Sequence, residues 1–123
     1  MDDGSEATRE VIERVNAAFN AHDVAAVMAL MTTDCVFENT WPPPDGERFQ
    51  GQAAVSGSWE RLFAATPDAY FSTEELITAG DRAVVRWRYT WTNADGSPGH
   101  VRGIDLFRVR DGKVAEKLSY VKG

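Results

Sequence analysis

The first third of the chain carries apolar residues at helical spacing. Over residues 6–20 they recur every three or four positions, which is the period of one face of a helix. Asp23 can cap a second helix whose apolar positions continue to Met31 with the same spacing. The pattern predicts a helical hairpin.

The pattern changes in the middle of the chain. Residues 35–39 predict a short strand that runs into the segment 41–46, where three prolines lack the N–H donors of a helix or a sheet. After Gly51, apolar residues return at helical spacing and stop before Pro67. This predicts a third helix.

The remaining residues favour strands, because β-branched and aromatic types are frequent and turn residues separate the runs. The expected strands are 69–79, 82–92, 100–109 and 113–121, and Asp111-Gly112 between the last two is a hairpin signal. The order α-α-β-α-β-β-β-β predicts an α+β fold in which the concave face of an antiparallel sheet packs on the helices.

Length and composition fit one folded unit. A chain of 123 residues is expected to form a single domain over residues 1–123, and 43% hydrophobic residues can bury a core. Aromatic residues reach 11%, and they include four tryptophans. Large aromatic side chains also line concave sites, so their frequency suits a fold with a pocket.

Charge and cysteine content narrow the functional classes. A net charge of −6 argues against a nucleic-acid or acidic-membrane binder, and no apolar run is long enough to span a membrane. The single Cys35 excludes an intrachain disulfide, and the acidic first residues do not resemble a secretory signal, so we expect a cytoplasmic protein. No Gly-rich phosphate loop and no Cys/His cluster occur, so neither cofactor nor metal is expected.

Three stretches resemble SnoaL-like proteins of the nuclear-transport-factor-2-like superfamily. They are RVNAAFNAHDVAAVMALMTTDCVFEN, the proline-rich loop with Gly51 and its helix, and GIDLFRVRDGKVAEKLSYV. The resemblance implies a cone-shaped curved sheet on three helices around a single pocket. It also implies a small apolar or amphipathic organic ligand, and homodimers are common in the superfamily. Its members catalyse many different reactions, so the resemblance does not identify the reaction of this chain.

The resemblance can be carried over residue by residue. Against ketosteroid isomerases, Asp105 falls on the acid of the oxyanion hole, whereas their tyrosine falls on Val15 and their general base on Asn39. Two of the three catalytic groups are thus replaced, which argues against steroid isomerisation by that mechanism. The SnoaL-type cyclases use a pocket aspartate as acid/base, and Asp105 is the carboxylate that every alignment places in the pocket.

Limonene-epoxide hydrolases give a second comparison. The segment FENTWPPP resembles theirs, which puts Asn39 on a water-positioning asparagine and Arg88 on their arginine. Their two aspartates fall on Thr90 and Ser119. Without these carboxylates the site cannot deprotonate a water as those enzymes do.

Asp105 is the polar member of an otherwise apolar alternating row over residues 101–109. A two-residue turn would place Leu118 opposite it, and a three-residue turn would place Lys117 there. The family pattern favours the second register, in which Lys117 and Ser119 share the pocket face with Asp105. Register therefore decides whether Asp105 is an acid of raised pKa or a member of a buried ion pair.

Two interpretations are possible for which side chains of residues 86–91 point toward the pocket. The alignments turn Arg86, Arg88 and Thr90 inward, and the outward aromatics would then need a second subunit across the sheet face. Burial preference alone would turn Trp87 and its aromatic neighbours inward instead.

These observations lead to two functional hypotheses. The first is a cofactor-free isomerase, cyclase or hydrolase-like enzyme, with Asp105 as acid/base and Asn39 orienting the polar end of the substrate. The alternative is a non-catalytic binding protein for an apolar metabolite. Asp105 could otherwise be an ion-pair partner, and Asn39 could cap the turn into the proline loop. The expected substrate-binding residues are Arg88, Trp41, Trp59, Phe63, Phe19, Lys117 and Ser119.

Overall fold

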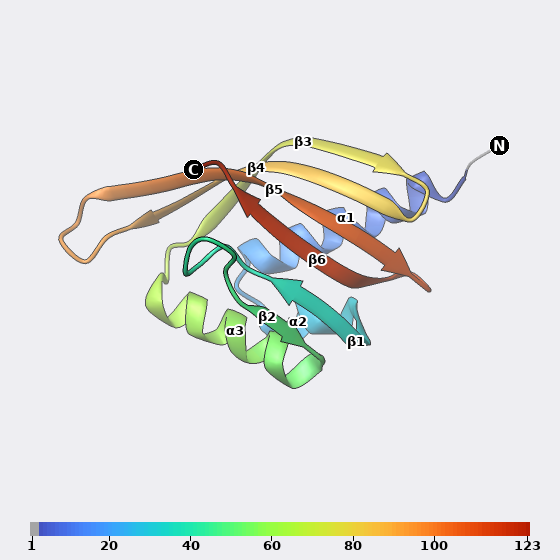
Figure 1. Cartoon of the computed structure of the whole chain (residues 1–123), viewed down its shortest axis with the longest axis horizontal. Coiled ribbons are helices and arrows are strands. Elements are labelled where there is room, and N and C mark those ends of the chain that lie inside the picture. Colours follow the sequence, from blue (N-terminus) through green and yellow to red (C-terminus); the bar gives the residue numbers. More distant parts are fainter. Residues whose placement is uncertain (1–2) are drawn as a thin grey trace.

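The computed structural model describes residues 3–123, and in them it places three helices and six strands (Figure 1). The helices are α1 (Ser5–Asn20), α2 (Val24–Ala29) and α3 (Gln52–Ala65). The strands are β1 (Met31–Glu38), β2 (Arg48–Gln50), β3 (Tyr70–Ala79), β4 (Arg82–Thr92), β5 (Pro98–Arg110) and β6 (Lys113–Val121). The predicted α+β class, a curved sheet on three helices, is confirmed.

The six strands form one curved sheet in the order β2-β1-β6-β5-β4-β3. Neighbouring strands are antiparallel except β1 and β6, which come from the two ends of the chain and pair in parallel. Figure 1 shows β3 to β6 arching over α1, whereas α3 lies beside β1 and β2. Helices therefore pack against the sheet at both ends of the strand order, α1 on the β3 side and α3 on the β2 side.

The predicted element boundaries hold best where the residue pattern is strongest. β4 and β6 span the predicted residues 82–92 and 113–121. β1 begins at Met31 rather than residue 35, because α2 ends at Ala29 and the chain turns at once into the sheet. The three-residue β2 was not predicted, since a strand this short carries no periodicity of its own.

The helix starts follow local chemistry. The Asp23 carboxylate accepts a hydrogen bond from the Ala26 backbone N–H at 3.0 Å, which confirms the predicted cap of α2. α3 begins after Gly51, whose φ of 87° lies in the region that favours glycine. Gln52, the first residue of α3, donates to the Met31 and Thr32 carbonyls and so ties this helix to β1.

The core lies between the concave face of the sheet and the helices. Ile12 from α1, Val55 from α3, Phe107 from β5 and Val114 from β6 are fully buried there. Gly103 on β5 has no room for a side chain, because a Cβ atom would lie 2.1 Å from the Tyr120 carbonyl oxygen. No helix in the part of the chain that the structure describes is long and apolar enough to cross a membrane.

Candidate functional site

A buried ion pair lies on the concave face of the sheet. The Lys117 Nζ is 3.1 Å from the Asp105 Oδ2, and the two side chains are only 7% and 5% exposed. The Ser119 hydroxyl donates to the other carboxylate oxygen, Oδ1, at 2.6 Å. Both oxygens of Asp105 are therefore engaged, one by a cation and one by a hydroxyl.

The register of β5 and β6 brings these groups together. Asp111-Gly112 forms the two-residue turn, but a bulge at Ala115 adds one residue to β6. Asp105 consequently pairs with Ser119 and Phe107 with Lys117. Neither Leu118 nor Lys117 lies directly opposite Asp105, because the two predicted registers placed no extra residue in β6. The expected pair between Asp105 and Lys117, on a face shared with Ser119, is nevertheless formed.

Aromatic rings surround the Lys117 ammonium. The Nζ lies 4.8 Å from the centre of the Phe37 ring, 5.7 Å from that of Phe19 and 5.8 Å from that of Phe107. Ring faces attract a cation, most strongly where water is excluded. The Asp105 carboxylate and the three rings together compensate the charge that Lys117 takes into the interior.

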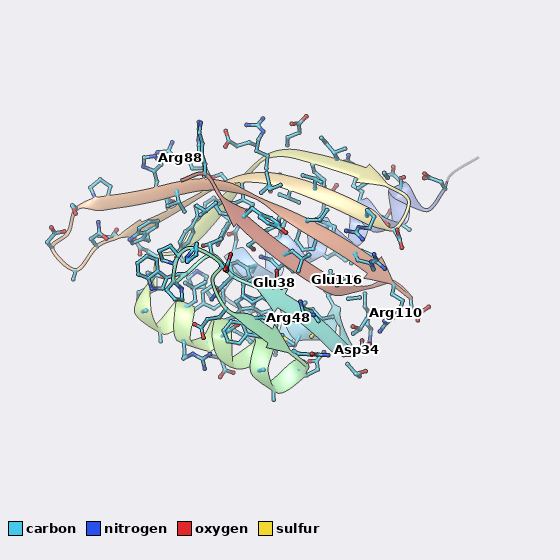
Figure 2. All side chains as sticks on the ribbon, in the orientation of Figure 1. Asp34, Glu38, Arg48, Arg88, Arg110 and Glu116 are labelled. Atoms are coloured by element: carbon cyan, nitrogen blue, oxygen red, sulfur yellow. The ribbon has the colours of Figure 1, made fainter. Side chains whose placement is uncertain are left out.

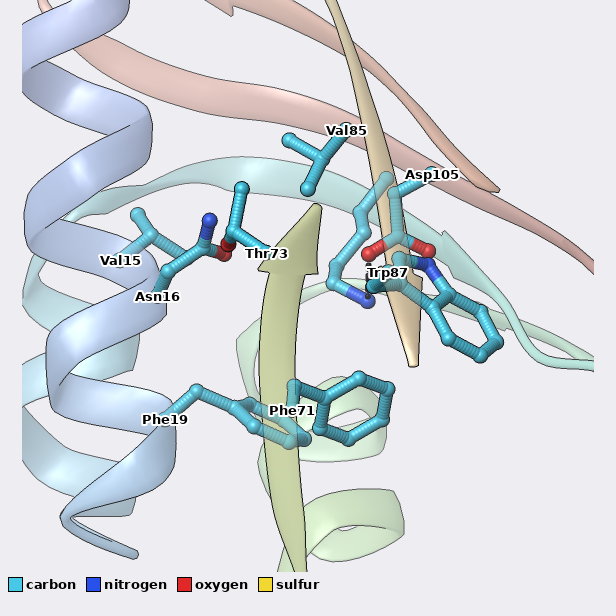
Figure 3. A pocket seen from close by; sticks show the side chains of 9 residues that line it. Val15, Asn16, Phe19, Phe71, Thr73, Val85, Trp87 and Asp105 are labelled. Carbon is cyan, nitrogen blue, oxygen red and sulfur yellow. Dashed lines mark ion pairs between the residues drawn. The ribbon is translucent and has the colours of Figure 1, made fainter. Parts of the chain in front are cut away.

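The Lys117 side chain borders two adjacent chambers. The larger cavity has a volume of about 210 Å³, and the smaller has one of about 20 Å³. Asp105 lines the smaller chamber, where Figure 3 shows it with Trp87 on the sheet side, facing Val15, Asn16 and Phe19 of α1. The larger cavity is lined mainly by aromatic and apolar side chains, namely Phe19, Phe37, Asn39, Thr40, Trp41, Ser58, Trp59, Leu62, Phe71, Trp87, Tyr89, Val101, Lys117 and Ser119.

Two tryptophans of the larger cavity have unpaired donors. Trp59 is 1% exposed and Trp87 is 3% exposed, and neither indole N–H has a hydrogen-bond partner. A buried donor without an acceptor is destabilising, because it has lost its hydrogen bonds to water. Both donors are therefore enclosed by protein without compensation.

Asn39 lies between the larger cavity and the proline loop. Its side chain lines the larger cavity, and its Oδ1 accepts a hydrogen bond from the Glu47 N–H at 2.7 Å. A Cβ atom on Gly46 would lie 2.0 Å from the Asn39 carbonyl oxygen, so the proline loop packs tightly on this residue. Asn39 therefore holds the loop that forms one wall of the cavity.

Most of the aromatic residues that the sequence singled out lie at the cavity. Trp59 and Phe19 are buried in its wall, and Trp41 is 72% exposed in the loop above it. Phe63 is absent from the lining of both chambers. Its ring packs behind Phe19, with centroids 4.9 Å apart, and stacks on His22.

The predicted inward position of Arg88 is wrong. Arg88 is exposed on the outer face of the sheet, and Figure 2 shows its side chain directed away from the helices. Trp87 and Tyr89 face the cavity instead, as burial preference alone would place them. The two aromatics need no cover from a second subunit, which removes the residue-based argument for a dimer.

Several lining residues were not among the predicted site residues. Phe71 lines the cavity from β3, and Trp87 and Tyr89 line it from β4. The alternation of the two β4 aromatics with charged residues is the signal that could have found them. Burial raises the pKa of the Tyr89 hydroxyl. Burial likewise raises the pKa of the Cys35 thiol, which keeps it in the unreactive thiol form.

Comparison with known families agrees with this geometry. The profile of the SnoaL-like domain matches residues 12–117. The chain belongs to the SnoaL-like family. None of the curated protein sequences compared with the chain matches it.

Solved structures extend the comparison. This SnoaL-like chain is 46% identical to a nuclear-transport-factor-2-like protein of unknown function from Mesorhizobium loti, over 100% of this chain and 97% of that one, with a TM-score of 0.84. A ketosteroid isomerase-like protein from Catenulispora acidiphila, in complex with trimethylamine, is 20% identical over 90% and 84% of the two chains, with a TM-score of 0.81. A protein from Sinorhizobium meliloti that is described as a proposed polyketide cyclase is 23% identical over 90% of this chain and 94% of that one, with a TM-score of 0.75. At these identities the last two show the fold alone.

Proposed function

We propose that this SnoaL-like chain is a cofactor-independent enzyme that transfers a proton on a small, largely apolar substrate, with Asp105 as the acid/base group. The observation that carries the proposal is the buried Asp105–Lys117 pair at the junction of an aromatic cavity and its smaller chamber. An ion pair in an apolar site is costly to maintain, which favours a use for its charges. Structures of this fold bind small molecules, such as trimethylamine in one relative.

Ser119 connects the carboxylate with the larger cavity. Its hydroxyl lines that cavity and donates to the Asp105 Oδ1 at 2.6 Å. A substrate C–H proton passes to the Ser119 oxygen as the hydroxyl proton passes to Asp105. The proton thus ends on the carboxylate, and the electron pair of the C–H bond stays on the substrate.

Lys117 stabilises the charge that this transfer creates. When Asp105 becomes neutral, the Lys117 ammonium loses its negative partner while the substrate becomes negative. The Lys117 Nζ lies at the border of both chambers, so its attraction can move from the carboxylate to the substrate anion. The two side chains act together, and Asn39 orients the polar end of the substrate.

Proton exchange tests the proposal without knowledge of the natural substrate. The protein is incubated in D₂O with small apolar compounds whose C–H bonds are activated by nitro, nitrile or carbonyl groups, and deuterium uptake is followed by mass spectrometry. We expect uptake above the buffer rate for at least one compound, reduced about 10²- to 10⁴-fold by Asp105→Asn. Asp45→Asn, in the exposed loop, is the matched control and leaves the rate unchanged.

A non-catalytic binding protein for an apolar metabolite is the second candidate. It is favoured by the full engagement of Asp105, since both of its oxygens already have partners. Native mass spectrometry of the purified protein distinguishes the binding protein from the enzyme. A ligand retained unchanged, with no deuterium uptake in any compound, would establish binding and overturn the enzymatic proposal.

Two further expectations remain proposals. We place the protein in the cytoplasm, supported by its single cysteine. A homodimer through the sheet face is supported by its frequency in the superfamily, and light scattering of the purified chain measures the mass directly.

A further inference from the structure

We infer that the protein also forms a covalent imine between the Lys117 amine and a small aldehyde or ketone in the larger cavity. The inference deepens the proposed function by naming a substrate class and a covalent role for Lys117. It rests on that function only in placing a small apolar substrate in this cavity, since an imine can form whether or not a proton is later transferred on the substrate.

The groups around Lys117 match the arrangement of an activated nucleophile. Such a nucleophile has a base within hydrogen-bond reach, and a third group orients the base. The Lys117 Nζ lies 3.1 Å from the Asp105 Oδ2, and the Ser119 hydroxyl donates to the other carboxylate oxygen at 2.6 Å. The Nζ also donates to the Ser119 oxygen at 3.5 Å. The amine therefore has both a base and a hydroxyl group beside it.

The amine also lies at the wall of the larger cavity. Lys117 is one of the lining residues, and its Nζ is 4.8 Å from the centre of the Phe37 ring and 5.7 Å from that of Phe19, two rings of the same wall. The chain has two other lysines, Lys113 and Lys122, which are exposed and line neither chamber. Lys117 is thus the lysine that a ligand in the cavity can meet.

Imine formation at this pair balances in atoms and electrons. Asp105 takes one proton from the Lys117 ammonium, and the freed electron pair on Nζ bonds to the carbonyl carbon while the C=O π pair moves to oxygen. A second N–H proton passes to that oxygen, which gives a neutral carbinolamine. Asp105 then returns its proton to the new hydroxyl group, the C–O bond breaks, and one water leaves as the nitrogen lone pair forms the C=N bond.

The reaction leaves the charge of the buried pair unchanged. An isolated charge is strongly destabilised in an apolar interior. Before the reaction the Asp105 carboxylate faces an ammonium, and afterwards it faces an iminium cation on the same nitrogen. The rings of Phe37 and Phe19 attract either cation. The site therefore accepts this covalent step without a new unpaired charge.

The cavity limits the size of the carbonyl compound. An apolar cavity of about 150 Å³ holds benzene, and the larger cavity here measures about 210 Å³. Its walls are mainly aromatic, and flat rings pack well against such walls. We therefore expect an aldehyde or ketone on a single ring or a short apolar chain, whereas three fused rings exceed the space.

Reductive trapping tests the inference on the unaltered protein. Benzaldehyde is added together with cyanoborohydride, which reduces an iminium to a stable amine, and peptide mapping by mass spectrometry locates the benzyl group. We expect Lys117 to be labelled about 10-fold or more faster than Lys113 and Lys122, because the cavity holds the carbonyl beside its amine. The two exposed lysines are matched controls within the same chain.

Three further measurements test whether labelling depends on the cavity. Ethylbenzene, an unreactive compound of similar size to benzaldehyde, should slow the labelling of Lys117 but not that of Lys113. Anthracene-9-carbaldehyde, with three fused rings, should label Lys117 no faster than Lys113. Lys117→Arg keeps a cation beside Asp105 but cannot form an imine, so labelling at the cavity should disappear while Lys113 and Lys122 are labelled as before.

Labelling of Lys117 no faster than that of Lys113 and Lys122, or at the same rate with and without ethylbenzene, overturns the inference. Both outcomes are measured on the unaltered protein, so they do not depend on whether Lys117→Arg folds. An adduct on Lys117 without deuterium uptake in any compound would support the imine and overturn the proton-transfer proposal. Deuterium uptake without an adduct would overturn the imine and leave the proton-transfer proposal in place.

Discussion

The two faces of the sheet carry the same kinds of charged residues in opposite surroundings. On the inner face, the side chains of Asp105 and Lys117 are 5% and 7% exposed. On the outer face, the side chains of Arg108 and Glu116 form an ion pair at 3.2 Å with 48% and 34% exposure. Both pairs lie on β5 and β6, so alternation along these strands, together with the bulge at Ala115, assigns each residue to its surroundings.

The difference shows that position, rather than residue type, sets what an ion pair does. Water solvates the outer charges whether or not they are paired, so the pairing adds little to stability. The inner charges have only each other, Ser119 and the surrounding rings. Their removal one at a time is therefore the strongest test of the comparison.

Removing the inner cation is expected to have the largest effect. Lys117→Met keeps the apolar stem but leaves the Asp105 carboxylate buried without its partner, which should lower the free energy of unfolding by about 3–5 kcal/mol. Urea denaturation measures the loss. Lys113→Met, at the exposed start of β6, is the control and should change stability by about 0.5 kcal/mol at most.

Replacing both inner charges sharpens the same prediction. Asp105→Leu together with Lys117→Met leaves no buried charge, so the double variant should be more stable than Lys117→Met alone. A double variant that is less stable than Lys117→Met would mean that the pair stabilises the fold beyond mutual neutralisation.

The next largest effect is expected from a single methyl group on the inner face. In Gly103→Ala the Cβ atom would meet the Trp87 ring at 2.7 Å and the Tyr120 carbonyl oxygen at 2.1 Å, so strand and ring must shift. We expect a loss of about 1–3 kcal/mol in thermal or urea unfolding. In Gly57→Ala, on α3, the nearest atom is the mobile end of Arg61 at 3.3 Å, and stability should be retained or raised. Equal losses in both would contradict the crowding argument.

The smallest effect is expected on the outer face. Arg108→Ala removes the exposed pair with Glu116, and the free energy of unfolding should change by less than about 1 kcal/mol. The difference between Arg108→Ala and the unaltered protein should shrink further in 0.5 M salt, since exposed charges are screened. A loss comparable to that of Lys117→Met would remove the distinction between the faces.

The sequence predicts the fold better than it predicts the candidate site, and particular residues show why. Helical spacing in residues 6–20 and aromatic alternation in residues 82–92 reflect burial, which the final structure also requires. The alignments with distant relatives turn Arg88 inward, whereas its burial preference turns it outward, and the structure follows the burial preference. The opening of the cavity depends on contacts between segments far apart in the chain, such as Phe71 with Trp87, and no local pattern encodes them.

The bulge at Ala115 has a consequence for how this site can change. Beyond it, Lys117 and Ser119 face the cavity, whereas an unbulged strand would turn Leu118 and Tyr120 there instead. Straightening this bulge without loss of a residue would thus exchange an amine and a hydroxymethyl group for an isobutyl group and a phenol, whereas deletion of Ala115 would leave Lys117 and Ser119 in place. Substitutions that abolish the bulge therefore offer a short evolutionary route, and an engineering route, between different chemistries in one scaffold.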